Sequence, residues 1–273
     1  MSRSAARGTL HLMPVPIAPA ARGAAGAPAA RPGWSAEEIG AALPAPAILL
    51  VRRSRYFLAE NARTARAFLK AAGHECALAS LQIVEIGHAP ADESLDAWLA
   101  PLLGTAERPP IDAVVLPEAG CPGIADPGAS LVARAQQLDI RVEPWVGPSS
   151  ILLALMGSGM NGQRFRFLGY LPQDRGELHA RIAQVQTDAR RGETQIFIET
   201  PYRNERLLEA LLGQLDADLE LCLAVELGSP ASALRTLSVA QWRALAPAQR
   251  PALARRPTVF LLHGRAARGA ARN

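Results

Sequence analysis

A turn rich in glycine and proline places the strongest constraint on how this chain can fold. Residues 117–128 read PEAGCPGIADPG, between the apolar run 111–116 and a segment with helical spacing. Three glycines and three prolines give such a turn a rigid backbone and little side-chain bulk. In open α/β sheets, ligands bind beyond the carboxyl ends of the strands. We therefore expect this turn to bring backbone N–H and C=O groups close to a small ligand.

Apolar runs of strand length alternate with amphipathic segments along the whole chain. Strands are predicted at 9–13, 48–51, 81–86, 113–116, 141–146, 165–170, 194–198, 220–225 and 258–262. Helices are predicted at 57–72, 93–103, 130–138, 147–156, 177–189, 204–215 and 241–245. Residues 18–47 suggest a surface loop with a short helix near 34–42, and the tail after 264 suggests disorder. This alternation predicts an α/β fold with mostly parallel sheets.

The chain length allows two domains. With 273 residues, each half can bury a core of its own. The segment Gly147-Pro148-Ser149-Ser150 has the composition of a helix N-terminus. We place the domain boundary there, which gives an N-terminal α/β domain over 1–146 and a C-terminal α/β domain over 147–273.

Composition narrows the class of protein. The net charge is +4, and Lys70 is the only lysine beside many arginines, a residue that suits phosphate and carboxylate recognition. The low aromatic content, 5%, argues against an extended base-stacking platform. Three cysteines and five histidines show no metal-ligand spacing, so no metal site is expected. An odd cysteine count, no clear signal peptide and no apolar run of membrane length favour a cytoplasmic protein without membrane contact.

Six short motifs resemble a known family when taken in order. They are TLHLMPVP (9–16), AENAR (59–63), EAGCPGIADPG (118–128), GPSS (147–150), GYLP (169–172) and ETPYR (199–203). Their order and spacing are similar to those of the tetrapyrrole methylase-like S-adenosylmethionine-dependent methyltransferases. The most similar branch comprises the bacterial enzymes that methylate a cytidine ribose 2′-oxygen in 16S ribosomal RNA.

This resemblance implies an architecture and a cofactor site. It implies two α/β domains of the tetrapyrrole methylase-like fold, S-adenosylmethionine in the cleft between them, a homodimer, and RNA of the small ribosomal subunit as partner. Main-chain groups of several loops hold the cofactor in this family. The matching positions are Pro16, Glu118, Ala119, Gly120, Ile124, Ala125, Asp126, Ser149, Ser150, Glu199, Thr200, Pro201 and Leu227.

The chemistry of methyl transfer agrees with this set of residues. A sulfonium methyl group is already activated, so the protein mainly supplies proximity and alignment. No catalytic base is assigned, and Glu60 and Arg63 are candidates for contact with the acceptor. Because a branched side chain at Gly120 would obstruct the ligand, we expect Gly120→Val to abolish cofactor binding with little loss of fold.

Other functions stay open at this stage. Asn61-Ala62 stands where the ribosomal RNA branch has Asp-Thr, and Glu118 where it has Asp. The alternatives are a methyltransferase for a tetrapyrrole or another small acceptor, a cofactor-binding paralogue without turnover, and a nucleotide-binding protein.

Overall fold

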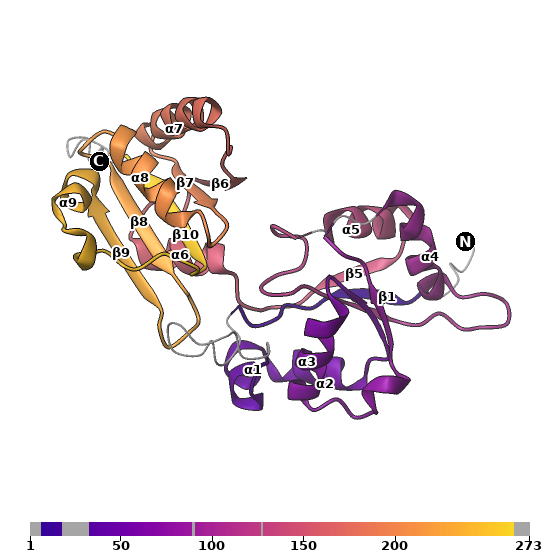
Figure 1. Ribbon diagram of the computed structural model, residues 1–273. Helices are drawn as coiled ribbons and strands as arrows, with labels where there is room; N and C mark the ends of the chain where they lie inside the picture. The colour runs from indigo at the N-terminus through magenta and orange to yellow at the C-terminus, as the bar shows by residue number, and fades with distance from the viewer. Residues whose placement is uncertain (1–6, 18–32, 89–90, 127, 265–273) are drawn as a thin grey trace, which may run out of the picture. The chain divides into compact units, whose positions relative to one another are not determined.

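The computed structural model describes residues 7–17, 33–88, 91–126 and 128–264. The chain divides into two compact units, Met1–Ser149 and Ser150–Asn273 (Figure 1). Each unit has its own sheet and its own hydrophobic clusters. The sequence had placed the boundary at 146/147, on the segment that leads into the first helix of the second unit.

The first unit is built on a five-stranded sheet in the order β3-β2-β4-β1-β5. Within the described residues every strand pair of this sheet is parallel, as predicted. The strands are β1 (Thr9–Leu12), β2 (Tyr56–Ala59), β3 (Gln82–Glu85), β4 (Ala113–Leu116) and β5 (Arg141–Pro144). The helices are α1 (Ala36–Ala42), α2 (Ala45–Arg53), α3 (Ala62–Ala72), α4 (Asp92–Leu103) and α5 (Gly128–Gln137), with a 3₁₀ turn η1 (Leu78–Ser80).

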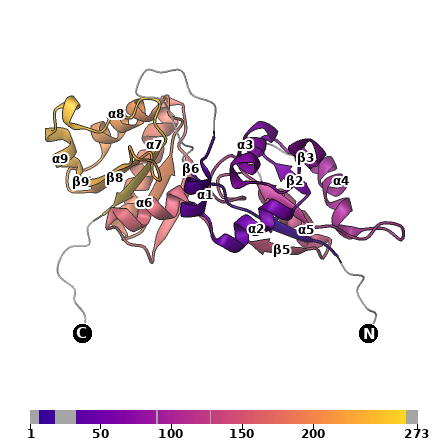
Figure 2. The same ribbon diagram turned by 90° about the horizontal axis from the view of Figure 1, so that it is seen from below.

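Both faces of this sheet are covered, which explains why strands β2 and β4 in its interior are wholly apolar. Phe57 and Ala59 of β2 pack in the cluster of α1, α2 and α3. Tyr56 and Leu58, which alternate with them, pack in the cluster of α4 and α5. Figure 2 shows the same unit from below. Such burial on two faces fixes the register of each strand.

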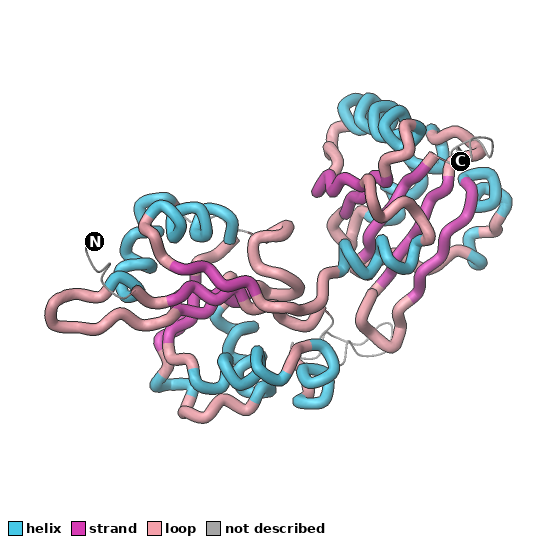
Figure 3. Tube along the Cα trace, turned by 180° about the vertical axis from the view of Figure 1, so that it is seen from behind, coloured by secondary structure: helices cyan, strands magenta, loops and turns pink. Residues whose placement is uncertain are grey.

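The second unit has a mixed sheet in the order β6-β7-β10-β8-β9. Figure 3 draws the strands in magenta. Its strands are β6 (Phe165–Tyr170), β7 (Thr194–Ile198), β8 (Glu220–Val225), β9 (Ala233–Ser238) and β10 (Thr258–His263). Its helices are α6 (Ser150–Ser158), α7 (Arg175–Arg190), α8 (Asn204–Gln214) and α9 (Val239–Ala244), with a 3₁₀ turn η2 (Pro247–Gln249). The helices α7, α8 and α9 contribute to one cluster and α6 to the other, on the two faces of the sheet.

Two predicted elements near the N-terminus were wrong. Residues 48–51 form part of helix α2, where Ala47 and Val51 are buried while Leu49 is 46% exposed. That pattern has helical periodicity, and a run of four apolar residues alone does not distinguish helix from strand. The helix predicted over 57–72 splits into strand β2 and helix α3, because the Asn61 side chain caps α3 and so fixes its start.

The second unit also differs from the prediction in its sheet. In the part described, β6–β7 is its one parallel pair, since β10 runs antiparallel to β7 and β8, and β9 antiparallel to β8. Strand β9 was missed because it lies at the sheet edge and is only partly buried. The predictions for residues 18–32 and for the tail 265–273 lie outside the described residues. No helix among the described residues is long and apolar enough to cross a membrane.

Candidate functional site

Three polar residues lie where neighbouring parallel strands of the first unit end. Glu60 directly follows β2, Glu118 follows β4 after one proline, and His88 follows β3 after a short turn. Strand β2 pairs with both β3 and β4 in parallel, so the carboxyl ends of all three strands lie at one end of the sheet. Open α/β sheets bind ligands at this end.

Glu60 joins these strand ends through its carboxylate. Its Oε2 accepts a hydrogen bond from the backbone N–H of Glu118 at 2.7 Å. Its Oε1 lies 2.7 Å from Nδ1 of His88. The Glu60 side chain is 12% exposed and that of His88 is 75% exposed. A partly buried carboxylate thus holds an imidazole that remains open to solvent.

The environment of Glu60 raises the pKa of its carboxyl. Burial is the largest cause, because loss of water disfavours the charged form, and the negative charge of Asp126 acts in the same direction. The hydrogen bond from the backbone of Glu118 acts in the opposite direction, as does that from His88. Perturbed carboxyls of this kind are concentrated at functional sites.

Arg63, the other candidate for acceptor contact, lies apart from this network. It is exposed in the first turn of α3, and its backbone N–H donates to the Asn61 side chain at 2.9 Å. Glu60 interacts with His88 instead, 28 residues away in the chain. Sequence reasoning missed His88 because it follows a predicted strand without any motif around it.

The glycine-rich turn pairs with the loop after β1. The backbone N–H of Gly120 donates to the Val15 carbonyl at 2.8 Å, and the N–H of Val15 donates to the Gly120 carbonyl at 2.9 Å. Pro16, which follows Val15, is buried. The structure therefore brings together the Pro16 loop and the Gly120 turn, which are about a hundred residues apart in sequence.

Positive φ angles explain the glycines of this turn and correct one expectation. Gly120 has φ 78° and Gly123 has φ 77°. A Cβ on Gly120 would meet Cγ2 of Ile17 at 3.6 Å and the Pro148 carbonyl oxygen at 3.9 Å, which are ordinary contacts. The cost of valine there comes from the backbone conformation, so Gly120→Val would strain the fold as well as obstruct a ligand.

Asp126 shapes the second half of the turn. Its Oδ1 accepts from the backbone N–H of Gly123 at 3.0 Å and from that of Gly128 at 2.9 Å. Its Oδ2 is buried and has no hydrogen-bond partner among the described residues. Ile124 and Ala125 between these contacts are exposed, as is Ala119. A buried carboxylate oxygen without a donor is an acceptor available to a ligand.

Ser149 and Ser150 lie at the junction between the two units. Helix α6 begins at Ser150, three residues after the helix start predicted at Gly147. Ser149 is 7% exposed and is the last residue of the first unit. The thiol of Cys121 lies 3.4 Å from the Pro148 carbonyl oxygen, which ties the segment before Ser149 to the glycine-rich turn.

The predicted cofactor-binding residues that follow β7 and β8 lie at one end of the second unit's sheet. The turn with Glu199, Thr200 and Pro201 follows β7, and Leu227 follows β8. Strand β10 lies between β7 and β8 and is antiparallel to both, so β7 and β8 run in the same direction and end at the same end of the sheet. Leu227 is half-buried against the cluster of α6. The backbone N–H of Arg255, just before β10, donates to the Pro201 carbonyl at 3.0 Å.

Glu199 is engaged within its own turn. Its Oε1 accepts from the backbone N–H of Thr200 at 2.6 Å and from Nη2 of Arg203 at 2.6 Å. The Glu199 side chain is 7% exposed. This carboxylate therefore orders the turn, in which the Thr200 carbonyl also accepts from the backbone N–H of Arg203 at 2.9 Å.

The described residues include one group with the composition of a metal site. Glu60, His88 and Glu118 each place one ligand atom within 4.8 Å of the others. The prediction of no metal centre rested on spacing along the chain, and these residues come from three separate strand ends. The hydrogen bonds of Glu60 account for this grouping without an ion.

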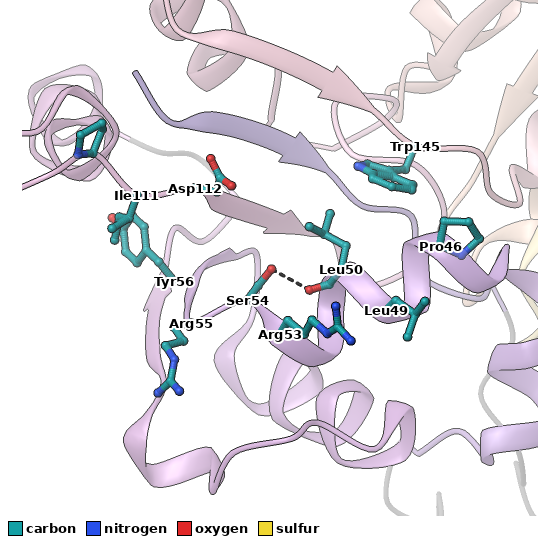
Figure 4. Close-up of a pocket in the computed structure, with 11 residues that line it drawn as sticks. Pro46, Leu49, Leu50, Arg53, Ser54, Arg55, Tyr56, Ile111, Asp112 and Trp145 are labelled. Atoms are coloured by element: carbon teal, nitrogen blue, oxygen red, sulfur yellow. Dashed lines mark hydrogen bonds between the residues drawn. The ribbon is translucent and has the colours of Figure 1, made fainter. Parts of the chain in front are cut away.

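A pocket of about 730 Å³ lies elsewhere in the first unit (Figure 4). It is lined by residues of α2 such as Leu49 and Arg53, by Tyr56 at the start of β2, and by Asp112 and Trp145. The Ser54 hydroxyl at its wall donates to the Leu50 carbonyl at 2.8 Å. Among the described residues, those that line this pocket include none of the predicted site residues.

Relatives of known name confirm the resemblance. The ribosomal RNA small subunit methyltransferase I of Pseudomonas aeruginosa is 37% identical over 133 residues, which are 48% of this chain and 45% of that protein. The protein of that name from Vibrio cholerae is 33% identical over 124 residues, 45% of this chain and 42% of its own. The matched part thus spans less than half the length of these relatives. No protein-family model matches the chain.

Solved structures confirm the fold. The cobalt precorrin-4 methyltransferase of cobalamin biosynthesis matches with a TM-score of 0.55 at 10% identity. The match covers 93% of this chain and 94% of that enzyme's chain. The uroporphyrin-III-C-methyltransferase of Thermus thermophilus has a TM-score of 0.50 at 18% identity and covers 94% of both chains. At such low identity the likeness concerns the fold alone, which is that of the tetrapyrrole methyltransferases, as predicted.

Proposed function

We propose that this protein is a cytoplasmic, homodimeric S-adenosylmethionine-dependent methyltransferase that acts on a ribose 2′-oxygen in the RNA of the small ribosomal subunit. The observation that carries this proposal is the similarity to relatives named ribosomal RNA small subunit methyltransferase I. The fold supports it, because its structural neighbours are methyltransferases.

The residues of the glycine-rich turn fit such a cofactor. The buried Oδ2 of Asp126 has no partner among the described residues and would accept from an ammonium or hydroxyl group. The glycines at 120 and 123 keep the backbone free of side chains. Pro16, Ala119, Ile124, Ala125 and Ser149 would complete the first unit's share. Ser150, Glu199, Thr200, Pro201 and Leu227 would supply that of the second unit.

The chain's own contribution to the reaction is alignment. The two hydrogen bonds between Val15 and Gly120 and the two that Asp126 accepts hold the turn in one conformation before any ligand arrives. Such preorganisation lowers the entropic cost of binding. When bound, the cofactor supplies an activated methyl group, so the protein must chiefly orient the acceptor hydroxyl toward it.

Two exposed tyrosines favour RNA as the acceptor. Tyr170 at the end of β6 is 60% exposed, and Tyr202 in the turn after β7 is 81% exposed. Strands β6 and β7 are parallel, so both tyrosines lie at the same end of the sheet, where these strands have their carboxyl ends. Exposed aromatic rings stack on nucleic acid bases, at about 1–3 kcal/mol per base. This is a small contact surface, consistent with the low aromatic content.

The test is transfer of a labelled methyl group. Wild-type protein is incubated with labelled S-adenosylmethionine and, separately, small ribosomal subunits, free RNA and a small-molecule extract, all from a strain that lacks this protein. We expect label in small-subunit RNA, at a ribose position that resists alkaline cleavage. Label in the small-molecule extract alone would support a tetrapyrrole or other small acceptor. Tight cofactor binding without methyl transfer would support a paralogue without turnover. Displacement of the cofactor by ATP would support a nucleotide-binding protein.

A further inference from the structure

We infer that His88 is the general base of the reaction, accepting the proton of the acceptor hydroxyl at Nε2, and that Glu60 is its positioning residue. This inference rests on the proposed function. It follows from a juxtaposition that only the fold creates: a partly buried carboxylate after β2 in hydrogen-bond contact with an exposed imidazole after β3. A base oriented by a third group is the arrangement found in catalytic triads.

Glu60 is held by the main chain, which makes it a rigid support. One oxygen accepts from the backbone N–H of Glu118, and the Glu60 backbone N–H itself donates to the Leu116 carbonyl at 2.9 Å. Only Oε1 remains for His88. A carboxylate at Nδ1 requires the proton on that nitrogen, which leaves Nε2 with its lone pair free.

The step balances without any further reactant. The acceptor oxygen forms a bond to the methyl carbon as the bond between that carbon and sulfur breaks, and the electron pair of the broken bond stays on sulfur. The proton of the hydroxyl moves to Nε2 of His88. The positive charge thereby passes from the sulfonium to the imidazolium, where the carboxylate of Glu60 stabilises it.

Glu60→Gln separates this role from a structural one. The glutamine amide keeps the shape of the carboxylate but has one acceptor and one donor end. The N–H of Glu118 needs the acceptor end, so the NH₂ group turns toward His88. Nδ1 must then accept, and the imidazole carries its proton on Nε2 instead. The variant is expected to fold normally and to hold the base in the wrong tautomer.

The first measurement needs neither cofactor nor RNA. Nitrogen-15 NMR of histidine-labelled protein distinguishes the two tautomers of His88, whose signals are assigned with His88→Gln. We expect Nδ1–H in the wild type and in Glu60→Asp, and Nε2–H in Glu60→Gln. The exposed Glu209 on α8 provides the matched control, Glu209→Gln, which should show the wild-type tautomer. An Nε2–H tautomer in the wild type would overturn the inference.

The second measurement is the rate of methyl transfer. His88→Gln and Glu60→Gln should lower kcat by about 100- to 10,000-fold, the usual contribution of a general base. Cofactor affinity and melting temperature should stay close to those of the wild type. Glu60→Asp should recover part of the rate, and His179→Gln, at an exposed histidine on α7, should leave it unchanged.

The two proposals fail in different ways. If the wild type transfers no methyl group to any RNA, the proposed function fails, and the tautomer measurement still reports the Glu60–His88 pair. If the wild type is active and His88→Gln equally so, the role of His88 fails while the function stands. Loss of activity in a chelator, with recovery on adding Mg²⁺ alone, would assign Glu60, His88 and Glu118 to a metal and also overturn the base.

Discussion

The carboxylate of Asp126 offers a sharp test of how the glycine-rich turn is built. Asp126→Ala removes the two hydrogen bonds that Oδ1 accepts from the backbone N–H groups of Gly123 and Gly128. Hydrogen bonds to a charged group contribute about 1.5–3 kcal/mol each. Both bonds share one oxygen of a half-buried side chain, and water can replace part of them. We therefore expect the free energy of unfolding to fall by about 3 kcal/mol.

The matched variant is Asp126→Asn. Its amide oxygen can accept the same two hydrogen bonds, so stability should stay within about 1 kcal/mol of the wild type. Its NH₂ group would stand where the buried Oδ2 lies, and it offers a donor instead of an acceptor. Cofactor affinity should consequently fall at least about tenfold, the equivalent of about 1.4 kcal/mol.

Calorimetry measures both effects. For a domain of this size, about 3 kcal/mol corresponds to a Tm lower by about 6–12 °C, which scanning calorimetry of Asp126→Ala resolves easily. Titration calorimetry of Asp126→Asn with S-adenosylmethionine gives the affinity. The reasoning is refuted if Asp126→Ala has the same Tm as the wild type, or if the Tm of Asp126→Asn is as low as that of Asp126→Ala. Unchanged cofactor affinity in Asp126→Asn would show that Oδ2 faces no ligand.

Two other perturbations test the packing of the first unit and its response to alkali. Gly147→Ala would place a Cβ 2.2 Å from Cβ of Pro14, so urea unfolding should show a loss of about 1–3 kcal/mol, whereas Gly162→Ala, with no atom within 4 Å, should be nearly neutral. Burial raises the pKa of Tyr56 to about 12, and its hydroxyl donates to the Trp98 carbonyl at 2.8 Å. Because the folded-state pKa lies above that of the unfolded chain, the stability this residue contributes should be lost as pH rises from about 10 toward 12. Denaturation at several alkaline pH values should show this loss in the wild type and not in Tyr56→Phe.

The sequence predicted the fold class because local patterns carry it. The all-apolar strands, the helix caps and the glycine-rich turn each reflect a local requirement that the chain must meet wherever it folds. The position of β4 and of the turn after it followed directly from residues 113–128. The same patterns failed at 48–51, where four apolar residues fit either a helix or a strand and only the packing of α2 on its neighbours decides.

The candidate site divides in the same way. The turn from Glu118 to Asp126 was predictable, since glycine tolerates the positive φ angles found at Gly120 and Gly123. The partnership of Glu60 with His88 was not, because the two residues are 28 positions apart and no motif links them.

What the sequence determined by itself, then, is the alternation of strands and helices in most of the chain and where the backbone must turn tightly, since propensity and periodicity act between near neighbours. Only the tertiary structure decided which side chains meet at the ends of those strands. Parallel pairing of β2 with both β3 and β4 brings Glu60, His88 and Glu118 to one end of the sheet. Burial of the Glu60 carboxylate among these strand ends then raises its pKa and gives it a single free oxygen for the imidazole.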